Sequence, residues 1–241
     1  MNLISYWFFI FVFIYRLIFN VEKCKIIIEN KLKEVENMKF HYMGKFDGNM
    51  DSLPKREHEP GAVMFKEPDN IEKFSKMMNM FSIIVFAVLI TISYLIGKVF
   101  LFDILGWLLF MLCLVVHEFL HAICFKEDVY MYNNLKQGNL FVVGNETMTK
   151  FRFCFMSLLP CIVLGIIPYV LFLINHDLVT FGTLGMFSLS SCVGDWYNVF
   201  NALTQMPKGA KTYLCGFNSY WYMPNGNRKE EKIENIEKIE E

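Results

Sequence analysis

An apolar run from Ile104 to Phe125 limits the folds that are open to this chain. Its length suits an α-helix that crosses the hydrocarbon core of a bilayer, which needs about 20 residues. The run contains His117-Glu118-Phe119-Leu120-His121. Helical residues four apart share a face, so both imidazoles could hold one Zn²⁺, with Glu118 beside it as a candidate general base. Ionisable groups in membrane sequence are costly and usually mark a functional site.

The composition of the whole chain also indicates a membrane protein. Of its 241 residues 54% are hydrophobic, with 25 Phe, and the formal net charge is −1. The apolar residues form blocks, whereas the helices of soluble domains carry an apolar stripe on one face. Because there is no basic excess, nucleic acid is not an expected partner. The oligomeric state cannot be read from these features.

Four apolar blocks predict core transmembrane helices. The first is Met77–Ile96, and the second follows Asp103 and carries the histidines. The third is Phe153–Ile174, where two prolines predict kinks, and the fourth is Leu178–Leu203, whose small residues favour close packing. The expected fold is an all-α membrane protein, a polytopic bundle of four core helices.

Two β-prone runs lie between the second and third blocks. Val129–Tyr132 and Leu140–Val143 predict a small β-hairpin with a loose loop. A packing role is the simple interpretation. The sharper hypothesis is that one of these runs adds an extended substrate to its edge, beside the histidines.

The chain divides into three parts by composition. Residues 1–37 form an N-terminal apolar extension, residues 38–225 the membrane domain, and residues 226–241 a charged tail. The extension is either an anchor, which would add a further membrane helix, or the result of a mis-called start. In the second case the functional protein begins at Met38.

A second polar insertion, Gly194-Asp195-Trp196-Tyr197-Asn198, supplies a candidate oxygen ligand in Asp195. With four spans, Asp195 and His117 lie toward the same membrane side. At the helical rise, His117 lies about 13 Å below Lys126, and Asp195 about 18 Å from Pro207, so the groups can meet. Asn198 could orient a substrate carbonyl or a ligand, or serve only in capping or packing.

The distribution of basic residues predicts the orientation in the membrane. Lys98 is the basic residue between the first and second helices, whereas the other side holds nearly all the rest. The positive-inside rule makes that other side cytoplasmic. The candidate metal site would then lie within the membrane, a few helical turns from the cytosol.

These motifs, together with Met206-Pro207-Lys208-Gly209-Ala210, resemble bacterial membrane proteins classified as domain of unknown function 3267 and described as zincin peptidases. The resemblance covers roughly residues 38–225. More distantly, the arrangement is similar to site-2-type intramembrane metalloproteases. It implies that His117, His121 and Asp195 are zinc ligands and Glu118 the base. The Leu-Asp-Gly of the site-2 family is absent, since the order here is Gly-Asp.

The resemblance implies a zinc-dependent peptidase in or at a bacterial plasma membrane, with peptides or membrane proteins as substrates. Its active site would face the cytoplasmic side. The alternative is a catalytically silent, metal-binding membrane scaffold or sensor. A transporter is disfavoured because no internal repeat is evident.

Overall fold

The computed structural model describes residues 40–68, 71–96, 103–134 and 139–224. These residues form a mixed α/β structure in which apolar helices are joined to two β-sheets with seven strands. The expectation of an all-α bundle with one small hairpin is therefore wrong. The expected N-terminal extension, 1–37, and charged tail, 226–241, lie outside the described residues.

Three of the helices that the structure describes are long and apolar enough to cross a membrane. They are α3 (Ile71–Leu95), α4 (Ile104–Ala122) and the continuous helix from Lys150 to Ile174. The last consists of α5 (Lys150–Pro160), a π-helical segment η2 (Cys161–Ile166) and α6 (Ile167–Ile174). These helices leave many apolar side chains exposed, which fits membrane association.

The start of α4 and the middle of the third span have local causes. The Asp103 side chain caps α4 by accepting the backbone N–H of Gly106 at 2.6 Å. The π-helical segment η2 begins directly after Pro160, whose ring lacks an N–H. A change in helix type thus accompanies the kink expected at this proline.

The expected fourth transmembrane helix is two shorter helices, α7 (Val179–Ser191) and α8 (Val193–Gln205). The helix breaks at Cys192, whose φ of −79° and ψ of 9° lie outside the α region. The four-span prediction fails here, because neither helix reaches the length that a bilayer requires. The break also lets α8 begin its own first turn immediately before Asp195.

Small residues let α7 pack at the centre of the helices, as the sequence predicts for this block. It contacts α3, α4, α6 and η2, and most of its residues from Gly182 to Ser190 are buried. A Cβ on Gly185 would lie 2.6–2.8 Å from backbone and side-chain atoms of Tyr169, and one on Gly182 would meet the Phe172 ring at 2.6 Å. Glycine is therefore required for the close approach of α6 and α7.

The first sheet contains β1 (Phe40–Lys45), β3 (Val129–Asn134) and β4 (Asn139–Val143), in the order β1-β3-β4. The β3–β4 pair is antiparallel, so the predicted hairpin is confirmed. The parallel pairing of β1 with β3 was not predicted. Strand β3 has a paired strand on each side, whereas β4 is paired on one side. Of the two predicted β-prone runs, the one in β4 is therefore at the edge that could accept another chain.

The second sheet joins β2 (Val63–Met64), β7 (Asn218–Tyr222), β6 (Lys211–Cys215) and β5 (Met148–Thr149) in that order. The two residues Gly216 and Phe217 connect β6 to β7, and Gly216 has a φ of +64°. Tyr213 of this hairpin is buried, and its ring stacks on that of Tyr220 and meets that of Tyr222 edge-on. A short 3₁₀ helix, η1 (Met50–Ser52), completes the described elements.

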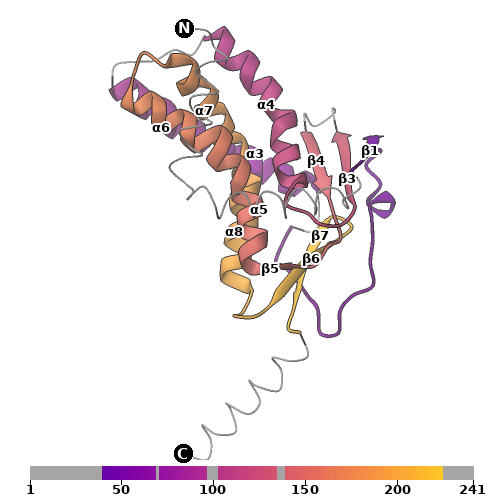
Figure 1. Cartoon of the computed structure of the whole chain (residues 1–241). Coiled ribbons are helices and arrows are strands. Elements are labelled where there is room, and N and C mark those ends of the chain that lie inside the picture. Colours follow the sequence, from indigo (N-terminus) through magenta and orange to yellow (C-terminus); the bar gives the residue numbers. More distant parts are fainter. Residues whose placement is uncertain (1–39, 69–70, 97–102, 135–138, 225–241) are drawn as a thin grey trace, which may run out of the picture. The chain divides into compact units, whose positions relative to one another are not determined.

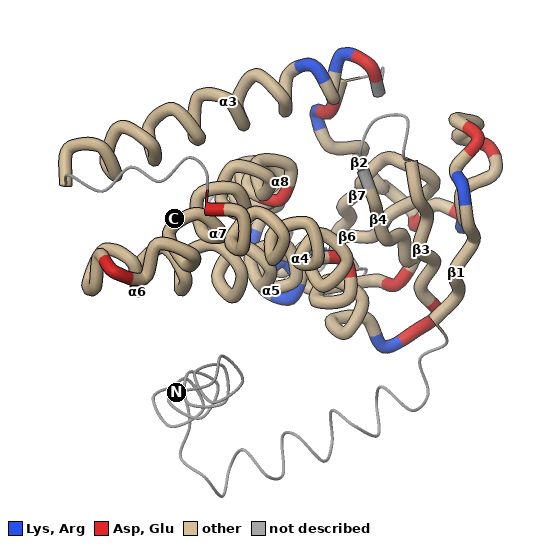
Figure 2. The backbone as a smooth tube through the Cα atoms, turned by 90° about the horizontal axis from the view of Figure 1, so that it is seen from above, with Lys and Arg blue, Asp and Glu red and all other residues tan. Residues whose placement is uncertain are grey.

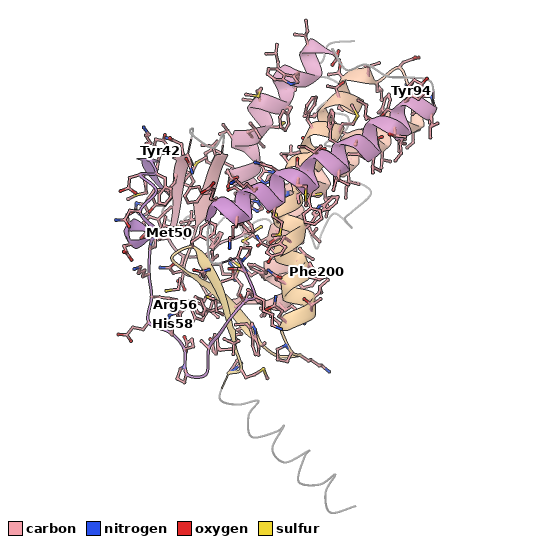
Figure 3. All side chains as sticks on the ribbon, turned by 180° about the vertical axis from the view of Figure 1, so that it is seen from behind. Tyr42, Met50, Arg56, His58, Tyr94 and Phe200 are labelled. Carbon is pink, nitrogen blue, oxygen red and sulfur yellow. The ribbon has the colours of Figure 1, made fainter. Side chains whose placement is uncertain are left out.

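The sheets lie beside α5 and the lower end of α4, whereas α6 and α7 extend away from them (Figure 1). Phe40 of β1 stacks on Phe119 of α4 at 5.1 Å between ring centroids, which joins the first sheet to the helix with the histidines. Lys and Arg cluster at the start of α3 and around the sheets, away from the far ends of the helices (Figure 2). Exposed aromatic side chains such as Tyr94 on α3 and Phe200 on α8 project from the helical part (Figure 3).

Candidate metal centre

His117 and His121 lie in the last turns of α4, one helical turn apart on the same face. Their Nε2 atoms are 3.1 Å from each other. The helix itself fixes this pair, because residues at positions i and i+4 project from neighbouring turns. This part of the site follows directly from the sequence.

Asp195 reaches the two histidines from the first turn of α8. Its Oδ2 is 3.2 Å from Nε2 of His117, and its Oδ1 is 3.2 Å from Nε2 of His121. The three side chains are only 12–14% exposed. Among the described residues, they are the one group of three or more His, Cys, Asp or Glu side chains with the spacing of metal ligands.

The donor set and its spacing fit zinc. With Zn–N and Zn–O bonds of about 2.0–2.1 Å, ligand atoms at the corners of a tetrahedron lie about 3.4 Å apart, close to the separations seen here. His121 also donates from Nδ1 to the backbone carbonyl of Met156 at 3.0 Å. That bond places the imidazole proton on Nδ1 and leaves Nε2 as the ligating atom, as in the outer shell of many metal-bound histidines.

Glu118 lies beside this cluster and lines the same cavity. Its carboxylate accepts a hydrogen bond from the backbone N–H of Val142 on β4. The strand therefore orients a carboxylate that does not belong to the three-residue cluster. Because the Glu118 carboxylate is not one of the candidate metal ligands, it can take up a proton and return it.

A cavity of about 320 Å³ extends from the cluster to the strands. One side, which we call the helical wall, is formed by residues of α4, α5 and α8, including Asn198 one turn after Asp195. A second part of the lining, which we call the strand wall, contains Leu140–Val143 of β4, the β6–β7 turn and Glu67. No Lys or Arg is among the described residues that line the cavity.

Glu67, just before α3, was not recognised from the sequence. Its Oε2 accepts the backbone N–H of Ser219 at 3.2 Å and the Asn218 amide at 3.5 Å. Burial raises the pKa of the Glu67 carboxyl, and these two hydrogen bonds offset part of that rise. The residue joins the segment after β2 to β7 and places a carboxyl in the strand wall.

Arg152 joins the end of α4 to the start of α5. Its Nε and Nη2 donate to the carbonyl of Cys124 at 3.1 and 2.6 Å, and its Nη1 pairs with Glu146. The Glu146 carboxylate accepts the backbone N–H groups of Lys126 and Glu127 at 2.5 and 3.2 Å. This network holds the chain just beyond His121, where α4 ends.

The remaining three histidines lie outside this cluster. His41 is 3.3 Å from Asp128 and stacks on Tyr130, and His58 contacts the Tyr213 hydroxyl at 3.1 Å. His176 packs against a phenylalanine at the end of α6. None of the three lines the cavity.

Several residues of the site were not found from the sequence, and each acts through its place in the fold. Met156 contributes a backbone carbonyl and Val142 a backbone N–H, which leave no trace in residue type. Glu67 is one acidic residue in a polar segment. The two-residue turn with Gly216 first, between β-prone runs, was a usable signal for the β6–β7 hairpin.

Residues 110–211 match the model of the family domain of unknown function 3267, whose description is "Putative zincin peptidase". The matched range includes both histidines, Glu118, Asp195 and Asn198. The resemblance to this family is confirmed over that range, and it supports a zinc peptidase. The likeness to site-2-type proteases stays a prediction. A search of curated proteins found no match, and a search of solved structures found none either.

Proposed function

We propose that this protein is a zinc-dependent peptidase that hydrolyses peptide bonds of membrane proteins or membrane-associated peptides. The observation that carries the proposal is the convergence of His117, His121 and Asp195 beside Glu118 in one cavity. Three protein ligands leave a position open on zinc, which is typical of catalytic sites, whereas structural sites use four.

The chain's own residues have distinct roles in this proposal. His117, His121 and Asp195 hold the metal, which when bound supplies a Lewis acid that activates water and polarises a carbonyl. Glu118, oriented by the Val142 N–H, takes the proton of the attacking water and returns it to the leaving amine. Asn198 lines the cavity and is proposed to orient the substrate.

The membrane is the proposed location of the reaction. Each of the three apolar helices of spanning length contributes residues to the cavity. Lys and Arg gather around the start of α3 and the sheets, so the positive-inside rule favours a cytoplasmic position for that end (Figure 2). We therefore propose a bacterial plasma membrane and an active site open toward the cytoplasmic side.

The edge of β4 is the proposed place for an extended substrate. Since the N–H of Val142 points outward to Glu118, the period of two puts the backbone groups of Leu140 on the same outer edge. A peptide unwound from a membrane helix needs new backbone partners, and a strand edge supplies them. The other run considered, Val129–Tyr132, is paired on both sides and is excluded.

Metal analysis of purified protein beside peptide cleavage tests the proposal. The wild type is expected to hold about one zinc per chain and to cleave a library of membrane peptides. His117→Ala, His121→Ala and Asp195→Ala should each lose the metal and the cleavage. His41→Ala, His58→Ala and His176→Ala are matched controls and should lose neither.

The same measurements separate the peptidase from its alternative. A wild type that holds zinc but cleaves no peptide in the library would favour the metal-binding scaffold or sensor. Zinc retained in the Asp195 variant would remove this residue from the ligand set. Zinc absent from wild-type protein would contradict both functions.

A further inference from the structure

Ser157 is a buried hydroxyl without a partner in the wall of the cavity. Its side chain is 0% exposed, its Oγ makes no hydrogen bond, and the residue lines the cavity that contains the metal cluster. Buried polar groups nearly always have a partner, so an orphan of this kind requires an explanation.

Other serine and threonine hydroxyls on the helices have a hydrogen-bond partner that the Ser157 hydroxyl lacks. Thr91, Ser93 and Ser190 each donate to the carbonyl four residues earlier, at 2.7–3.0 Å. That bond is the ordinary way for a helix to satisfy a serine or threonine. Ser157 makes no such bond to its own helix, so its hydroxyl has no partner within the described structure.

Ser157 lines the same cavity as the candidate metal ligands and directly follows a residue that contacts one of them. The preceding residue on α5, Met156, accepts the Nδ1 hydrogen bond of His121. The α5 helix also packs against both α4 and α8, which carry the rest of the cluster. A substrate carbonyl that reaches the metal ligands therefore comes close to this part of α5.

We propose that the Ser157 hydroxyl donates a hydrogen bond to the carbonyl oxygen of the peptide bond that is cleaved, which makes Ser157 a catalytic residue. This inference rests on the proposed peptidase function. Among the described cavity residues there is no Lys or Arg that could stabilise the oxygen instead.

The proposed step adds water to the peptide carbonyl, and the adduct then collapses to the two cleavage products. The water oxygen bonds to the carbonyl carbon, its proton passes to Glu118, and the C=O π electrons move onto the carbonyl oxygen. Ser157 stabilises the negative charge that develops there. The electron pair on this oxygen then re-forms the C=O bond and the C–N bond breaks. The leaving nitrogen takes the proton from Glu118.

A comparison of Ser157→Ala with Ser188→Ala tests the inference. Ser188 on α7 is also buried and has no partner for its hydroxyl, but it does not line the cavity, so it is a matched control. Removal of one donor to a developing oxyanion typically lowers kcat by 10²–10³. We expect a fall of about a hundredfold in Ser157→Ala, with KM and zinc content unchanged, and no change in Ser188→Ala.

Binding of a phosphinic peptide, which mimics the charged transition state, gives a second readout that needs no turnover. Its affinity for Ser157→Ala should fall by about the same factor as kcat, whereas affinity for the cleavage products should not change. Equal kcat and equal phosphinic-peptide affinity in Ser157→Ala and wild type would overturn the role of Ser157 and leave the peptidase intact.

A wild type that cleaves nothing would contradict the proposed function itself. The phosphinic peptide then decides the inference alone: weaker binding by Ser157→Ala supports the hydrogen bond, and equal or absent binding overturns it. A loss of zinc or of folded protein specific to Ser157→Ala would also overturn it, because it would show that the serine supports the structure.

Discussion

The two walls of the cavity differ in how the sequence builds them. The helical wall takes His117 and His121 from one helix, where the four-residue spacing alone brings them together. The strand wall takes Glu67, β4 and the β6–β7 turn from segments that are far apart in the chain. Val142 and Glu118 connect the two walls by a hydrogen bond.

This difference suggests that the two walls have different roles in the proposed reaction. The helical wall holds every candidate metal ligand and the candidate base, so changes there should affect metal and chemistry. The strand wall offers an edge strand and a carboxyl, so changes there should affect how substrate is held. Substitutions at Glu118 and Leu140 test this division, and substitutions at Arg152 and Glu67 test the contacts that stabilise each wall.

Glu118→Gln should have the largest effect. A positioned general base supplies about 10²–10⁴ in rate, so peptide cleavage should fall a hundredfold or more. Zinc content should stay at the wild-type level, because Glu118 is outside the ligand cluster. Glu57→Gln, on the exposed surface, is the control. Cleavage at the wild-type rate by the Glu118 variant would place the chemistry elsewhere.

Arg152→Met tests what holds the end of the helical wall. The substitution leaves the buried Glu146 carboxylate without its cation, and loss of a charged hydrogen-bonding partner costs about 2–3 kcal/mol. Denaturation in detergent should show a lower free energy of unfolding. Lys55→Met, which breaks an exposed pair with Asp51, should leave it unchanged. Equal losses in the two variants would show that the buried network is no stronger than a surface pair.

The sequence predicted the helical wall well for a physical reason. The length of an apolar run is a local property of the sequence, so α3, α4 and the third span could be placed from composition alone. The approach of Asp195 followed from counting spans and depths, although its helix breaks at Cys192. Asp195 contacts both histidines although the span that was expected to carry it is two shorter helices.

The strand wall could not be predicted in the same way. Phe40 of β1 pairs with Val129, and Val63 of β2 pairs with Trp221, so the partners are far apart in the chain. Strands β2 and β5 have two residues each, too few to show a period of two. The aromatic residues of β7 also suit a membrane interface, so their residue types alone do not indicate a strand.

Leu140→Pro tests the edge of β4. Proline removes the outward backbone N–H, and the loss of one hydrogen bond to substrate should lower kcat/KM about tenfold while zinc stays bound. The matched control is Phe141→Pro. Its N–H belongs to the inner edge that faces Tyr132 of β3, so this variant should disrupt the first sheet. Cleavage at the wild-type rate by the Leu140 variant would show that substrate does not bind at this edge.

Glu67→Gln should have the smallest effect, and it should depend on pH. Because burial raises the pKa of the Glu67 carboxyl, the folded protein binds this proton more tightly than the unfolded chain. Stability is therefore lost as pH rises from the ordinary glutamate pKa through the raised one. Gln keeps an acceptor for the Ser219 N–H but never ionises. The Tm of this variant should equal that of wild type at acidic pH and exceed it at alkaline pH, whereas Glu57→Gln should give no such divergence. A Glu67→Gln curve that runs parallel to wild type at every pH would show that the carboxyl acts only as a structural acceptor.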